Sequence, residues 1–110
     1  MDVVLLPEVE TELNALPHGE RVAMLNVLEK LRILGALLAA PHSSQVKGTT
    51  LRELRPRAGR SARRGFYRRI GEELVVGSIG PEARHDRQGF NRSVAAAETR
   101  LARYRSEREP

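Results

Sequence analysis

Residues 47–70 read KGTTLRELRPRAGRSARRGFYRRI, and this stretch gathers nine of the nineteen basic residues of the chain against a single acid, Glu53. The stretch therefore carries a charge of +8, whereas the whole chain of 110 residues carries +5 and everything outside the stretch sums to −3. Basic charge that is concentrated in one segment indicates a polyanionic partner. The eight arginines of the stretch are Arg52, Arg55, Arg57, Arg60, Arg63, Arg64, Arg68 and Arg69.

The same stretch predicts two β-strands joined by a turn. Residues 51–57 and 62–70 are rich in residues that suit a pleated surface, and the link at 58–61 contains Gly59. Neighbouring side chains of a strand point to opposite faces, so arginines occur on both faces of the second strand. Because an arginine is seldom buried without a partner, we expect one face of this hairpin to open to solvent or to a ligand. Alternatively, the charges only keep a solvated hairpin from aggregating.

The rest of the chain predicts helices around this hairpin. A strand at residues 3–6, a helix that starts at Pro7 and a helix at residues 19–34 precede it, and residues 35–48 form a loop. A third strand is expected at residues 74–79, and a helix that starts between residues 81 and 89 carries one apolar face. The apolar face of that helix consists of Phe90, Val94, Ala97, Leu101 and Tyr104. The fold class is α+β, with a small antiparallel sheet in the order strand, helix, helix, strand, strand, strand, helix.

Length and composition restrict the remaining possibilities. The 110 residues are expected to form one domain, with residues 107–110 as a frayed tail. Cysteine is absent, which excludes disulfides, thiolate zinc sites and cysteine nucleophiles. The three histidines show no metal-ligand spacing, so we expect no metal and no other cofactor. No apolar run has the length of a membrane span or the layout of a signal peptide, so we expect a cytoplasmic protein without a membrane partner.

Several short motifs follow one another in a fixed order. They are the run Val46-Lys47-Gly48, the run LRELRP at residues 51–56, the pair Gly59 and Arg60, the run Arg64-Gly65-Phe66-Tyr67, the apolar third strand and the terminal helix. In this combination the chain resembles the phage-derived branch of the RelE/ParE toxin superfamily, which includes the HigB-type toxins. The resemblance covers nearly the whole chain, and its specificity comes from the order of the motifs.

The resemblance implies a RelE-like toxin of a type II toxin–antitoxin pair. Many relatives are metal-independent, ribosome-associated endoribonucleases that inhibit translation by cleaving mRNA, with the 2′-hydroxyl beside the scissile phosphate as nucleophile. The implied partners are mRNA, the ribosome and a cognate antitoxin, which in many such pairs carries a helix-turn-helix. Other relatives poison gyrase, so a ParE-like gyrase poison and a catalytically inactive nucleic-acid-binding relative remain alternatives.

The resemblance also assigns roles to arginines of the hairpin. Arg64 matches the arginine that begins the second hairpin strand in RelE-like nucleases and contacts the phosphate. Arg55 matches the arginine of the Glu-Leu-Arg signature, where it serves either the site or the structure by pairing with Glu53. The further candidates for phosphate binding are Lys47, Arg52, Arg60, Arg63 and Arg68.

Two departures from the family affect proton transfer. Pro81 and Glu82 stand where many RelE-like nucleases carry further basic residues, and Phe90 stands where some carry a catalytic tyrosine. Arginine stays protonated and cannot readily take the proton of the 2′-hydroxyl. Histidine is the residue type that titrates near neutrality, so His85 is the third catalytic candidate. The weaker candidate bases are Asp86 and Glu53.

Overall fold

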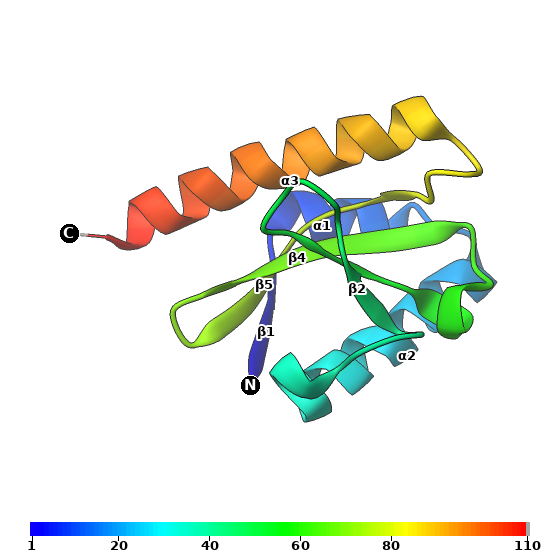
Figure 1. Ribbon diagram of the computed structural model, residues 1–110, viewed down its shortest axis with the longest axis horizontal. Helices are drawn as coiled ribbons and strands as arrows, with labels where there is room; N and C mark the ends of the chain where they lie inside the picture. The colour runs from blue at the N-terminus through cyan, green and yellow to red at the C-terminus, as the bar shows by residue number, and fades with distance from the viewer. Residues whose placement is uncertain (110) are drawn as a thin grey trace.

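Strands β4 and β5 form the centre of a five-stranded sheet in the computed structural model, which describes residues 1–109 (Figure 1). β4 (Arg63–Ile70) and β5 (Glu73–Pro81) pair antiparallel across a turn at Gly71, whose φ of +61° favours glycine. The strand order is β1-β5-β4-β3-β2. The other strands are β1 (Asp2–Leu5), β2 (Ser43–Gln45) and β3 (Arg52–Leu54).

Helices cover both faces of the sheet. The Cβ position of Gly65 on β4 lies 3.6 Å from the sulfur of Met24 on α2 (His18–Leu34), which packs on one face. The next residue, Phe66, points to the other face and meets Phe90 of α3 (Arg87–Arg108), with ring centroids 5.4 Å apart. α1 (Pro7–Asn14) packs along β5. No helix among residues 1–109 is long and apolar enough to cross a membrane.

α3 packs directly on the backbone of β5 because a glycine leaves room for it. Phe66 pairs with Ser78 and Tyr67 with Val76, so Gly77 is an extra residue that bulges from the ladder. A Cβ at Gly77 would lie only 2.9 Å from Cγ of Leu101. The predicted apolar face of α3 is confirmed. Ala97 and Leu101 are fully buried, and Phe90, Val94 and Tyr104 pack against the core.

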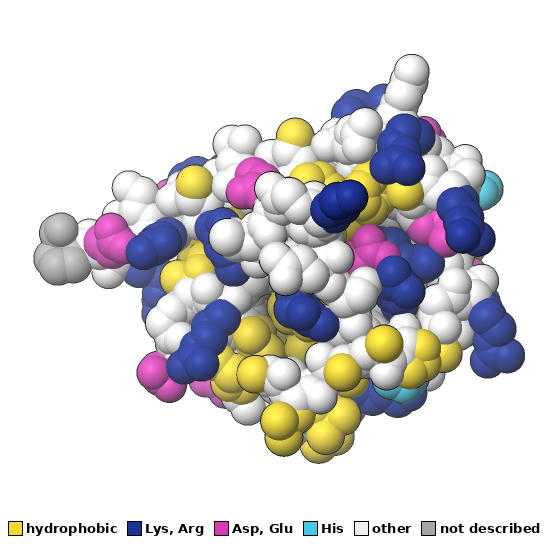
Figure 2. All heavy atoms as spheres, viewed as in Figure 1, with side chains coloured by type: hydrophobic (Ala, Val, Ile, Leu, Met, Phe, Trp, Pro, Cys, Tyr) yellow, Lys and Arg dark blue, Asp and Glu magenta, His cyan; other side chains and the backbone are white. Residues whose placement is uncertain are grey.

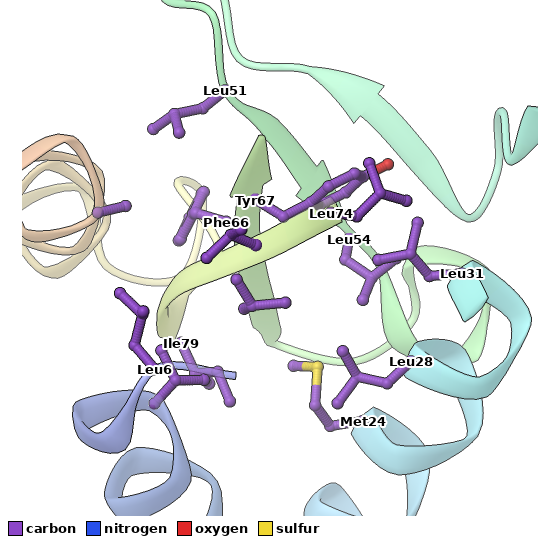
Figure 3. Close-up of a cluster of buried hydrophobic side chains, with 14 of the residues drawn as sticks. Leu6, Met24, Leu28, Leu31, Leu51, Leu54, Phe66, Tyr67, Leu74 and Ile79 are labelled. Atoms are coloured by element: carbon purple, nitrogen blue, oxygen red, sulfur yellow. The ribbon is translucent and has the colours of Figure 1, made fainter. Parts of the chain in front are cut away.

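The core lies on both sides of β4 and β5 (Figure 3). Leu54, Phe66 and Tyr67 come from the arginine-rich stretch itself, so this stretch supplies apolar packing as well as charge. α2 faces the sheet with Met24, Leu28 and Leu31.

The structure differs from the predicted elements in five places. Residues 43–45 form β2 and not a loop, and the predicted strand at 51–57 is reduced to β3 because Pro56 begins a short 3-10 helix, η2 (Pro56–Gly59). β1 runs parallel to β5, so the sheet is mixed, not wholly antiparallel. α3 continues to Arg108, through part of the segment expected to be a frayed tail, and residue 110 lies outside the described residues. A second short 3-10 helix, η1 (Gly35–Leu37), follows α2.

Candidate functional site

The turn between β3 and β4 has a left-handed backbone. Arg57 and Ala58 both have φ of 54°, and Gly59 follows with φ of +92°. A non-glycine residue in this region costs roughly 1–2 kcal/mol, so neighbouring contacts must hold the turn. Glu20 at the start of α2 supplies them, since it accepts from Nη1 of Arg57 at 3.0 Å and also from the hydroxyl of Ser61.

This turn wraps its carbonyl groups around the guanidinium of Arg64. Nη1 of Arg64 donates to the carbonyls of Ser61 and Arg63 at 2.7 and 2.9 Å, and Nη2 donates to the carbonyl of Gly59 at 3.4 Å. Two carboxylates complete the set. They are Glu53, which accepts from Nε at 3.4 Å, and Glu82, which accepts from Nη2 at 2.9 Å.

Arg64 is therefore buried and does not lie on an open face of the strand. The residue is only 4% exposed, and all five of its N–H donors are used within the protein. Burial is tolerated because both carboxylates neutralise the charge, which is the partnered exception to the rule that arginines stay exposed. Arg64 holds the carboxylates of Glu53 and Glu82 in place, and its catalytic role stays a prediction.

A hollow of about 370 Å³ opens above Arg64. Arg55 shares this hollow, and its Nε donates to Glu53 at 2.9 Å while its side chain stays 35% exposed. Arg84 is exposed and makes no ion pair or hydrogen bond within the described chain. Unlike Arg64, Arg55 and Arg84 thus keep donors for an anion. The hollow is lined by Glu53, Arg55, Gly59, Arg64, Glu82, Ala83 and Arg84.

His85 lies in a different hollow. Residues 82–84 line the first hollow, whereas His85 and Asp86 line a second one of about 460 Å³ together with Arg63 and Arg92. Asp86 caps α3 there, because its Oδ1 accepts from the N–H of Gly89 at 2.9 Å. The structure brings Arg55 and Arg64 together but separates His85 from them.

The remaining candidates for phosphate binding do not gather in one place. Arg52 donates to the hydroxyl of Ser43, and Arg68 donates to the hydroxyl of Thr50. Lys47 and Arg60 are exposed and line neither hollow, and Arg63 lines the second.

Acidic residues from other elements offset much of the basic charge. Five of the eight arginines in the stretch form ion pairs with glutamates, and acidic and basic side chains mix on the surface shown in Figure 2. These five are Arg55, Arg57, Arg64, Arg68 and Arg69. The field of the stretch is therefore weaker than its sequence charge. Residues 1–109 contain no group of three or more side chains that could hold a metal ion.

Sequence reasoning missed the position of Glu82. It noted Glu82 as a departure from the family pattern but did not place it beside Arg64. The register offered a signal, because Arg64 pairs with Gly80 and Glu82 follows two residues later, on the same side of the sheet.

Comparison with known proteins gives a family and a fold. Residues 11–78 match the family described as Phage derived protein Gp49-like (DUF891). Among solved structures, a chain of the toxin-antitoxin complex RelBE2 from Mycobacterium tuberculosis is similar, with a TM-score of 0.54 and 15% sequence identity. The match covers 74% of this chain and 96% of that chain, and at this identity it shows a shared RelE-like fold. No curated protein matches the chain.

Proposed function

Because the chain belongs to the phage-derived Gp49-like family, we propose that it is the toxin of a type II toxin–antitoxin pair and that it cleaves mRNA on the ribosome, which inhibits translation. The observation that carries this proposal is the hollow above Arg64, where two arginines with free donors, Arg55 and Arg84, stand beside a carboxylate. The shared fold with a chain of a toxin-antitoxin complex supports it. Fold alone does not specify a function, so the proposal depends on the site.

The hollow suits the charge of a phosphodiester undergoing cleavage. Attack of a 2′-hydroxyl on the neighbouring phosphate builds negative charge on its oxygens, which donors held in place by the protein stabilise. Arg55 and Arg84 bind the phosphate, while Arg64 fixes Glu53 and Glu82 around it. The products are a 2′,3′-cyclic phosphate and a 5′-hydroxyl, and the reaction needs no metal or other cofactor.

The test is induction of the chain alone in cells, with RNA ends and DNA breaks followed in the same culture. We expect new RNA ends with 5′-hydroxyl groups. The double substitution Arg55→Ala and Arg84→Ala should reduce them by about 10²-fold or more, because it removes both free phosphate donors. Arg69→Ala is the matched control, because it removes one charge from the far end of β4 and should leave cleavage unchanged.

A ParE-like gyrase poison or a catalytically inactive nucleic-acid-binding relative is the second candidate. It is favoured by His85, which lines a different hollow from Arg55 and Arg64, and by Phe90, which packs on Phe66 where some nucleases carry a tyrosine. DNA breaks without new RNA ends would assign the chain to the gyrase poisons. Neither kind of break would assign it to the inactive relatives.

A cognate antitoxin, of the helix-turn-helix type in many such pairs, is the proposed protein partner. It would hold the toxin inactive in the cytoplasm by covering exposed basic residues, so complex formation should weaken with salt, since exposed charges are screened over about 8 Å at physiological ionic strength. Failure of any protein encoded beside the gene to bind the chain would contradict this pairing.

A further inference from the structure

Glu82 is fixed in place by hydrogen bonds, yet its side chain remains partly exposed to solvent. It follows the last residue of β5, and its N–H donates to the carbonyl of Ala62 at 2.8 Å, which fixes its backbone beside the start of β4. Its Oε2 accepts from Nη2 of Arg64 at 2.9 Å. The side chain is nevertheless 27% exposed and lines the hollow. Arg64 thus orients a carboxylate that a ligand in the hollow can reach.

The other two carboxylates near the hollow are less available than Glu82. The side chain of Glu53 is 13% exposed, and its Oε1 already accepts from Arg55 and from Arg64. Asp86 caps α3 and lines the second hollow. Oε1 of Glu82, like Oε2 of Glu53, makes no hydrogen bond within residues 1–109, but the Glu82 side chain is about twice as exposed and has a single arginine partner. Glu82 is therefore the carboxylate best placed to take a proton in the hollow.

We propose that Glu82 is the general base for RNA cleavage in this hollow, an inference that rests on the proposed function. With the phosphate on Arg55 and Arg84, Oε1 of Glu82 takes the proton of the 2′-hydroxyl. The 2′-oxygen then forms a bond to phosphorus, and the bond from phosphorus to the 5′-oxygen breaks. The leaving 5′-oxygen takes a proton from water, and Glu82 returns its own proton to solvent, so protons and electrons balance.

This role assigns different tasks to neighbouring residues. Arg64 is a positioning residue, because its donors are all engaged and it acts through the carboxylate that it holds. Arg55 and Arg84 contact the substrate. The role also explains why an acid can occupy a place where many RelE-like nucleases carry a basic residue, since arginines cannot take the proton and Glu53, the other carboxylate of the hollow, is less exposed.

The test is Glu82→Gln in the full chain, because glutamine keeps the shape and can still accept from Arg64. Cleavage rates are measured on a synthetic RNA and on ribosome-bound message. Binding is measured separately with an RNA whose 2′-hydroxyls are replaced by hydrogen, and a thermal melt checks the fold. Glu72→Gln, whose carboxylate is 94% exposed at the far turn, is the matched control.

We expect Glu82→Gln to lower cleavage by about 10²-fold or more and to bind the uncleavable RNA as the wild type does. Unchanged cleavage would overturn the inference. Faster cleavage with tighter binding would also overturn it, because Glu82 would then only neutralise the charge of Arg64 and keep the phosphate from it.

Glu82→Asp keeps the test valid if Glu82→Gln loses stability. An aspartate restores the carboxylate one methylene further back, so it should recover part of the rate. An aspartate variant no faster than the glutamine variant would overturn the role. A wild-type chain that cleaves neither RNA would refute the proposed function itself, which is a different outcome from active wild type and active Glu82→Gln.

Discussion

At the scale of single residues, the site depends on how a buried guanidinium is satisfied. Arg64 makes five hydrogen bonds, three to carbonyl groups of the preceding turn and its own strand and two to glutamates. A substrate phosphate that bound Arg64 directly would have to displace one of them and leave a carboxylate without its partner. This geometry favours phosphate contact by Arg55 and Arg84, whose donors are not all engaged.

Arg64→Ala should therefore destabilise the fold. It would leave Glu53 and Glu82 without their buried partner, and breaking such a pair costs about 3–5 kcal/mol. Arg55→Ala should cost roughly 1 kcal/mol or less, since that side chain is 35% exposed and solvent screens its ion pair. Urea unfolding of both variants measures the difference. Equal stability of Arg64→Ala and the wild type would contradict the buried network.

The sequence singled out Arg64 and Arg55, which the structure places in one hollow, but it did not indicate their partners there. Glu53 and Arg55 of the Glu-Leu-Arg signature line the hollow together with Arg64, the arginine at the start of the second hairpin strand. The pairing of Arg64 with Glu82 spans 18 residues and depends on the register of two strands, which no local pattern encodes. His85 was proposed because histidines in general titrate near neutrality. That property does not indicate which of the two hollows the side chain lines.

At the scale of elements, side chains from two helices satisfy backbone groups of β5 that no strand pairs with. β1 ends at Leu5, so the edge of β5 beyond Val76 has no neighbouring strand. Glu12 of α1 accepts from the N–H of Ile79 at 3.0 Å, and Arg100 of α3 donates to the carbonyl of Gly77 at 3.1 Å. These groups satisfy an edge that would otherwise invite pairing with another chain.

The left-handed turn of η2 makes a prediction at this scale. Ala58→Gly should stabilise the protein by about 1 kcal/mol, because glycine adopts φ of 54° without the clash that alanine suffers. Ala102→Gly is the matched control, because its exposed helical site should lose about 0.5–1 kcal/mol on the same change. Thermal melts of both variants measure the two signs. A loss of stability in Ala58→Gly would show that the turn is unstrained.

A hydrogen bond between α3 and β5 predicts that the stability of the protein falls at alkaline pH. The hydroxyl of Tyr104 donates to Glu73 at 2.7 Å, and this hydrogen bond raises the pKa of Tyr104 above its ordinary value. A raised pKa means that the folded state holds the proton more tightly than the unfolded chain. The stabilisation is therefore complete below about pH 10 and is lost as the pH rises through the folded-state value.

Tyr104→Phe isolates this contribution, because it removes the hydroxyl and keeps the ring that packs under Arg108. The stability difference between wild type and variant should be constant near neutral pH and should shrink above about pH 10. Chemical unfolding at a series of pH values measures it. A difference that is the same at every pH would mean that the hydrogen bond does not form.

At the scale of the whole molecule, the order of helices and strands followed from periodicity and turn residues. Most elements could be located from the apolar face of α3 and from the junctions at Pro7, Gly35 and Gly71. β2 was not predictable, because three polar residues without alternation become a strand only when β3 pairs with them. The parallel pairing of β1 was also hidden, since it joins segments about 70 residues apart.

The distribution of charge was the largest difference between sequence and structure. A stretch of +8 predicts a strong field, yet five of its arginines pair with glutamates. Four of these glutamates come from outside the stretch: Glu20, Glu72, Glu82 and Glu98. Composition counts charges but does not report their partners. The surface available to RNA is thus a small set of free cations and not the whole stretch.

This distinction predicts the salt dependence of RNA binding. Each phosphate contact to single-stranded RNA contributes about −0.7 to the slope of log affinity against log salt concentration. If all nine basic residues of the stretch contacted RNA, the slope would be about −6, whereas two to four contacts by free cations such as Arg55 and Arg84 give about −1.4 to −2.8. We expect the smaller slope, measured with the uncleavable RNA. Arg55→Ala should reduce its magnitude by about 0.7, and Arg69→Ala should leave it unchanged, because Arg69 lies at the far end of β4. A slope near −6 would mean that the ion pairs of the stretch open when RNA binds, and the hollow above Arg64 would then be only part of a wider interface.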